Sequence, residues 1–112
     1  MEIDRLKSSI WIQAQIRICA LSHLSTYVIK KGDPDAGAIF ILINKLNGDN
    51  FIYYQKRDMK GDIGWEKSNS TPLNEKEVSD YLEKQKKYDP DLWILEIEDP
   101  AGEYKFGGTL SQ

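Results

Sequence analysis

The sequence predicts an α+β fold built as a two-layer sandwich, in which two helices pack on one face of a mainly antiparallel sheet of four to five strands. Three observations favour this fold: apolar residues at helical spacing near the N-terminus, short apolar segments separated by turn residues, and a capping signal for a second helix before a final strand. With 112 residues, 40% of them hydrophobic, the chain can build one core. We therefore expect a single domain over residues 1–106 and a flexible tail over residues 107–112.

Composition narrows the classes of function. The N-terminus has no apolar run after basic residues, and no segment is apolar for long enough to cross a bilayer, so we expect neither secretion nor membrane insertion. Cys19 is the single cysteine and His23 the single histidine, which leaves no internal disulfide and no zinc site of the usual kind. These features indicate a cytoplasmic protein without a cofactor. The net charge of −3 disfavours binding to nucleic acid.

The first helix is expected over most of residues 11–24, with a short strand before it at residues 9–12. Strand-like alternation over residues 10–20 competes with the helix, but Ala, Gln, Arg and Leu favour helix and no turn residue interrupts. One row at helical spacing is expected to face the core: Ile3, Leu6, Ile10, Ala14, Arg17, Leu21 and Leu24. A second row lies nearly opposite and is expected to form an interface with a second copy or with another protein: Ile12, Ile16 and Cys19. Cover of this row by a strand from the C-terminal segment is the alternative.

Turn signals divide the rest of the chain into strands and one helix. Three strands are expected in the first half, at residues 26–31, 38–45 and 51–57. The hairpin signal Asn47-Gly48 separates the last two of them, and Trp65 is expected on a short fourth strand. Asn74 with Glu77 predicts a capping box for a second helix, which ends at Asp89. A last strand is expected at residues 92–98.

Four short motifs resemble those of a known family: Trp11-Ile12-x-Ala14-x-x-Arg17, Lys31-Gly-Asp-Pro-Asp-Ala-Gly37, Asp89-Pro-Asp-Leu-Trp93 and Glu96-Ile-Glu-Asp99. With them the chain resembles the small bacterial proteins of domain of unknown function family fourteen ninety-one. The resemblance spans roughly Ser8 to Asp99. Members often carry a second Arg directly after the first, where this chain has Ile18. The resemblance implies one domain and brings no established activity.

The two Asp-Pro-Asp segments are the sharpest candidates for chemistry. If the fold brings Asp33, Asp35, Asp89 and Asp91 to one end of the sheet, four carboxylates could bind Mg²⁺ or Ca²⁺. The simpler interpretation, which we favour, is that these Asp residues cap turns and that Pro fixes them. Residues of the same motifs complete the candidate site: Trp11, Arg17, Trp93 and Glu96.

Arg17 lies on the row expected to face the core, so its guanidinium needs an acceptor. It could bind an anion near the end of the sheet. A pair with Asp33, Asp91 or Glu96 is the preferred interpretation, because an unpaired buried charge is costly. His23 and Cys19 predict no catalytic arrangement, so no catalytic residue is identified.

Residues 51–57 interleave aromatic with basic side chains, as a platform for single-stranded nucleic acid would. Phe51, Tyr53 and Arg57 share one face of the expected strand, whereas Tyr54 and Lys56 share the other. A core-facing side and a solvent-facing side of one strand explain this pattern more simply.

The sequence is most consistent with a small cytoplasmic binding or protein-interaction domain, with a protein partner or a second copy of itself as the expected partner. A carboxylate-rich, metal-dependent enzyme is the first alternative. A binder of single-stranded nucleic acid is the second.

Overall fold

The computed structural model describes residues 7–57, 59–60 and 63–106. Its elements follow in the order α1 (Ser8–Leu21), β1 (Ser25–Lys30), β2 (Ile39–Asn44), β3 (Asn50–Arg57), β4 (Ile63–Lys67), α2 (Glu75–Tyr88) and β5 (Trp93–Glu98). The strands form one sheet in the order β1-β5-β2-β3-β4, in which only the β2–β5 pair is parallel. The predicted α+β class and mainly antiparallel sheet are confirmed. The predicted tail at residues 107–112 lies outside the described residues.

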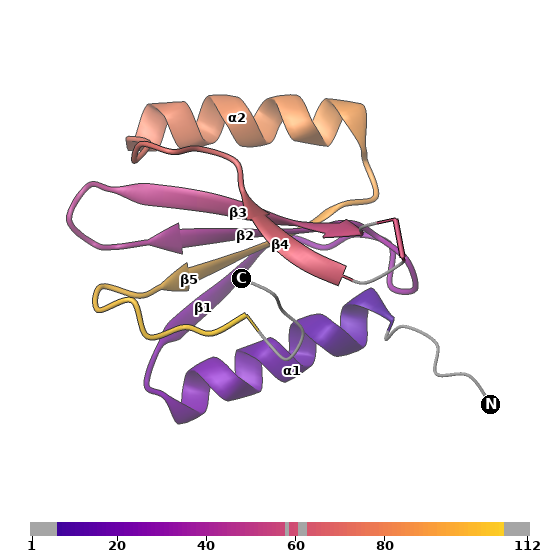
Figure 1. Ribbon diagram of the computed structural model, residues 1–112, viewed down its shortest axis with the longest axis horizontal. Helices are drawn as coiled ribbons and strands as arrows, with labels where there is room; N and C mark the ends of the chain where they lie inside the picture. The colour runs from indigo at the N-terminus through magenta and orange to yellow at the C-terminus, as the bar shows by residue number, and fades with distance from the viewer. Residues whose placement is uncertain (1–6, 58, 61–62, 107–112) are drawn as a thin grey trace.

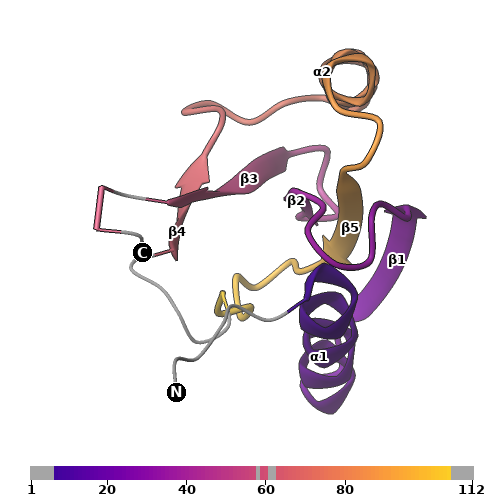
Figure 2. The ribbon, with the colours of Figure 1, turned by 90° about the vertical axis from the view of Figure 1, so that its right-hand side faces the viewer.

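The two helices cover opposite faces of the sheet, so the prediction of two layers is wrong (Figures 1 and 2). α1 packs on one set of alternate strand residues, which includes Ile41 and Leu95, whereas α2 packs on the other set, which includes Leu42 and Ile94. Successive residues of a strand point to opposite faces. Because the central strands β2 and β5 are apolar on both faces, each face needs its own cover, and three layers result.

α1 packs on the core with the opposite face from the one that the sequence predicts. The helix starts at Ser8, so the short strand expected at residues 9–12 is wrong, and Ile12 rather than Ile10 faces the core. Ile12 is 2% exposed, while Ile10 and Leu21 are 49% and 77% exposed. Both rows are apolar, so helical periodicity alone does not choose between them.

Local signals mark the start of α2 as predicted, whereas α1 ends at Leu21, before the predicted end at Leu24. Asn74 and Glu77 form the predicted capping box, since the Asn74 side chain accepts from the Glu77 backbone N–H and the Glu77 carboxylate accepts from the Asn74 backbone N–H. His23 follows α1 with a φ of 62°, and the next backbone N–H, of Leu24, donates to the carbonyl of Cys19. A left-handed residue at this position is a common way to end a helix.

The irregular segment 99–106 covers the part of the lower sheet face that α1 leaves open (Figure 1). The buried carboxylate of Asp99 organises its start, accepting from the backbone N–H groups of Glu103 and Tyr104 at 2.7 and 3.1 Å. The Tyr104 hydroxyl then donates to the Gln15 side chain on α1. This segment and α1 therefore form one continuous cover.

Candidate functional site

The two Asp-Pro-Asp turns meet in space through their backbones. The backbone N–H of Asp33 donates to the carbonyl oxygen of Asp91 at 2.9 Å, and the indole Nε1 of Trp93 donates to the carbonyl oxygen of Asp33 at 2.8 Å. A Cβ on Gly32 or Gly37 would collide with the Asp91 carbonyl oxygen. Both glycines are therefore needed for this close approach of two backbones.

The first of these turns also caps α1. The backbone N–H groups of Ser8 and Ser9 donate to the carbonyl oxygens of Asp35 and Pro34, and the Ser8 hydroxyl donates to the Gly37 carbonyl oxygen at 2.6 Å. The unpaired N–H groups of a helix start are thereby satisfied without a side-chain cap from Lys7. The motifs around Trp11, Asp33 and Trp93 thus converge on one structural junction.

Although the backbones of the two turns meet, the four Asp carboxylates do not come together. Asp33 accepts from the backbone N–H groups of Asp35 and Ala36, and Asp89 accepts from the backbone N–H of Asp91. Asp35 instead lies 3.7 Å from the Lys7 ammonium, on the surface. Among the described residues, no three His, Cys, Asp or Glu side chains are grouped so that they could hold a metal ion. The arrangement matches the interpretation in which Asp caps a turn.

Arg17 is exposed, and none of the described carboxylates lies within ion-pair distance of it. The expected pair with Asp33, Asp91 or Glu96 is therefore wrong, because α1 turns Arg17 to solvent, where it needs no partner. Glu96 accepts from the Asn44 side chain at 3.0 Å instead. Trp11 is 8% exposed and packs against Trp65 on β4, with ring centroids 5.1 Å apart.

The residues expected to form a subunit interface lie in the core. Ile12 and Cys19 are 2% and 0% exposed, and Ile16 is half-buried against the same cluster. Burial, and secondarily the charge of Asp99, raises the pKa of the Cys19 thiol to about 11. A buried thiol with a raised pKa is a poor nucleophile.

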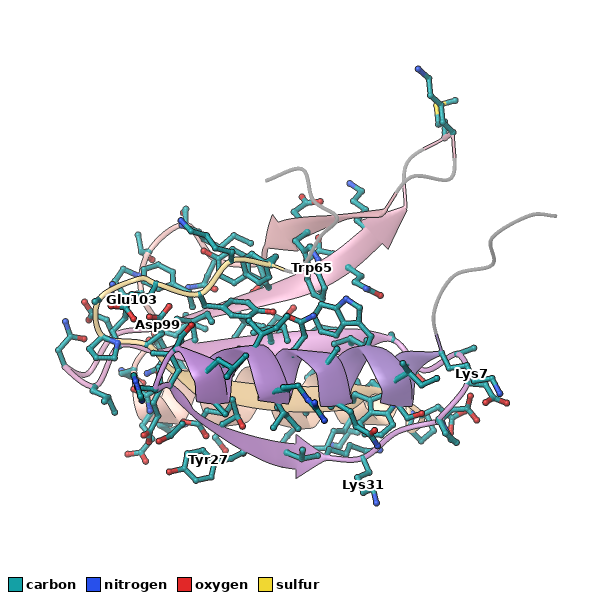
Figure 3. All side chains as sticks on the ribbon, turned by 90° about the horizontal axis from the view of Figure 1, so that it is seen from below. Lys7, Tyr27, Lys31, Trp65, Asp99 and Glu103 are labelled. Atoms are coloured by element: carbon teal, nitrogen blue, oxygen red, sulfur yellow. The ribbon has the colours of Figure 1, made fainter. Side chains whose placement is uncertain are left out.

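A surface that sequence reasoning missed lies along β1, at the edge of the sheet. Among the described strands β1 pairs only with β5, and its residues Tyr27, Val28 and Ile29 are 49%, 42% and 47% exposed. The register shifts between Val28 and Lys30, which marks a bulge. Tyr27 projects from the free side of this strand, and Lys31 lies just beyond its end (Figure 3). The sequence predicts a strand here, but only the strand order shows that it is an edge.

Family and structure comparisons agree with this fold. The family described as Protein of unknown function (DUF1491) matches residues 6–106, and no curated protein matches the chain. In none of the described helices is there an apolar stretch long enough to cross a membrane.

Solved structures of similar proteins superpose over most of the chain. The crystal structure of a DUF1491 family protein from Caulobacter crescentus CB15 has a TM-score of 0.80 and 26% identity, covering 96% of this chain and 98% of that chain. The solution structure of protein Atu0922 from A. tumefaciens has a TM-score of 0.73 and 29% identity, covering 85% of this chain and 86% of that one. Since the family match spans nearly the whole sequence, this chain belongs to the DUF1491 family, which confirms the resemblance seen in its motifs.

Proposed function

We propose that this chain is a protein-interaction domain that self-associates through the free edge of β1. The main support for this proposal is that β1 is an edge strand on which Tyr27, Val28 and Ile29 are all more than 40% exposed. An edge strand presents unpaired backbone N–H and C=O groups that can pair with another strand. Apolar side chains on such an edge favour pairing over solvation.

The charges near the two ends of β1 favour a second copy in antiparallel orientation. On the adjacent strand, Glu98 lies opposite Ser25 and Glu96 opposite Tyr27, so the first half of β1 has acidic neighbours. The strand ends in Lys30, and Lys31 follows it. Lys30 already donates to the carbonyl oxygen of Pro90 at 2.6 Å, which leaves Lys31 as the more available cation. An antiparallel copy brings the basic end of one strand to the acidic end of the other.

The proposed register places the two-fold axis at Tyr27, the most exposed of the three side chains. Tyr27 is paired with Glu96, and Val28 with Leu95, so these two β1 side chains point to opposite faces of the sheet. In a two-fold antiparallel pair, directly opposite side chains share a face. Tyr27 therefore lies opposite Tyr27 of the copy, and Thr26 lies opposite Val28 of the copy. The two sheets join edge to edge.

The contact is small, so the association is weak. Three apolar side chains per copy bury an area well below that of standard interfaces, and we expect a Kd on the order of 100 µM. The bulge at Val28–Lys30 limits how far the pairing extends.

Sedimentation velocity between about 20 µM and about 1 mM, where a dimer of this affinity changes from minor to major species, tests the proposal. The wild-type chain should dimerise with rising concentration. Tyr27→Lys places two ammonium groups opposite each other at the two-fold axis and should remain monomeric. Tyr88→Lys is the matched control, because Tyr88 is 71% exposed at the end of α2. A wild-type monomer at every concentration, or equal behaviour of the two variants, would overturn the proposal.

The two alternative functions have less support. A carboxylate-rich, metal-dependent enzyme needs a ligand set, and no group of three candidate ligands occurs in the described part of the chain. A β-strand that binds single-stranded nucleic acid needs its aromatic side chains on one face of the sheet. Tyr54 instead packs near Phe40 on the α2 side, and Lys56 forms an ion pair with Glu66.

A further inference from the structure

A pocket of about 270 Å³ lies on the lower face of the sheet, between the strands and segment 99–106. Its walls are aromatic and its rim is basic. The residues that matter for its chemistry are Lys45, Phe51, Tyr53, Lys67, Asp99 and Phe106. None of them belongs to the β1 edge, so this pocket is independent of the proposed self-association.

The strand register gathers these side chains on one face. Phe51 and Tyr53 are two residues apart on β3, and Tyr53 is paired with Lys67 on β4. Phe51 is paired in turn with Ile43 on β2, two residues before Lys45. Side chains two apart, or directly paired, share a face. Phe106 closes the aromatic wall, with its ring centroid 4.5 Å from that of Tyr53.

The two lysines keep their charges available to a ligand. The Lys67 ammonium lies 4.7 Å from the centre of the Phe51 ring and 6.0 Å from that of Tyr53. Lys45 reaches to the turn at Gly102, where its Nζ would lie 3.9 Å from an added Cβ. Within the described ranges, neither ammonium has a carboxylate at ion-pair distance.

Among the described residues that line the pocket, Asp99 is the one acidic group, and its carboxylate already accepts hydrogen bonds. It is 2% exposed and accepts from two backbone N–H groups, those of Glu103 and Tyr104. With two lysine ammonium groups and one hydrogen-bonded carboxylate, the described pocket wall has a net positive charge. The pocket is therefore suited to an anion.

We propose that this pocket binds a small molecule that carries one flat aromatic ring and one anionic group. The ring packs against Phe51 and Phe106, and the anion lies between the ammonium groups of Lys45 and Lys67. The volume of about 270 Å³ is near the lower end of ligand pockets, which fits a single ring and excludes a fully enclosed dinucleotide. Lysine is a point charge without a fixed fork, so a carboxylate and a phosphate both satisfy it.

Titrations followed by amide chemical shifts test the pocket with defined probes. The aromatic anions are 4-hydroxybenzoate and uridine 5′-monophosphate. Phenol and uridine are the corresponding neutral compounds, and acetate and inorganic phosphate are the corresponding anions without a ring. At least one aromatic anion should bind at least about tenfold more tightly than both its neutral and its ring-free match, because loss of a charged contact costs about that factor. Whichever anion binds identifies the carboxylate or the phosphate as the recognised group.

Lys67→Met removes the ammonium group above Phe51 and keeps an unbranched side chain, so it should weaken binding by about tenfold. Lys84→Met is the control, because Lys84 is exposed on α2 and the change in net charge is the same. The spectrum of each variant shows directly whether it is folded. The proposal is overturned if neither aromatic anion shifts the pocket resonances at millimolar concentration, or if the two variants bind equally well.

Discussion

The indole Nε1 of Trp93 donates a hydrogen bond to the backbone carbonyl oxygen of Asp33 at 2.8 Å, across 60 residues of sequence. This bond ties the first residue of β5 to the turn that also caps α1. The same carbonyl accepts from the backbone N–H of Gly37. The family motifs at these positions are therefore explained by the junction of α1 with the sheet.

Replacement of Trp93 measures the strength of this junction. Trp93→Phe should lower the free energy of unfolding by about 2–3 kcal/mol, because it removes both a hydrogen bond and buried ring volume. Trp65→Phe is the matched control, since the buried Nε1 of Trp65 has no hydrogen-bond partner among the described residues. Urea unfolding of both variants checks the difference, and an equal loss in the two would show that the hydrogen bond contributes nothing.

The glycine at the same junction should tolerate no side chain. Gly37→Ala places a Cβ against the carbonyl oxygen of Asp91 and beside the Trp93 ring, so we expect a loss of about 3 kcal/mol or more. Gly48→Ala has open space around its Cβ but a φ of 95°, so it should cost only about 1 kcal/mol. Thermal unfolding of the two variants distinguishes collision from backbone strain, and similar melting temperatures would contradict the close approach.

The orientation of α1 can be tested with two isoleucines of the same helix. Ile12→Glu buries a carboxylate at a 2% exposed position and should unfold the domain, whereas Ile10→Glu lies at a 49% exposed position and should change stability by less than about 1 kcal/mol. Circular dichroism of both variants provides the measurement. The opposite outcome would mean that the core faces the row containing Ile10.

Stability should fall at alkaline pH because two buried acids are neutral in the folded protein. Burial raises the pKa of the Cys19 thiol from 9.0 to about 11, and burial also raises the pKa of the Tyr104 phenol. The unfolded chain releases these protons first, so the stabilisation is complete below about pH 9 and is lost as pH rises towards 11. Cys19 alone contributes on the order of 2 kcal/mol to this loss.

Urea unfolding at intervals from pH 7 to about pH 11 measures the loss, since the slope against pH reports the protons released. Cys19→Ala is less stable at every pH because of the cavity, but it should lose less stability between pH 9 and pH 11 than the wild type. Parallel curves for the two proteins would rule out the thiol as a source of the pH dependence.

Much of the local structure follows from the sequence alone. Asn74 and Glu77 predict the start of α2, Asn47-Gly48 predicts the turn between β2 and β3, and the two Asp-Pro-Asp segments predict turns. These features depend on contacts within a few residues, between side chains and their own backbone. Such contacts are readable from neighbouring residue types.

Only the tertiary structure decides how those pieces are combined. Both rows of α1 are apolar, so packing against Tyr104 and the sheet, rather than periodicity, turns Ile12 inward and Arg17 outward. The strand order decides that β1 is an edge and that Lys45, Phe51 and Lys67 share one pocket. The helices separate onto two faces because β2 and β5 are apolar on both. Each of these outcomes depends on pairing between segments far apart in the chain, which local residue patterns do not specify.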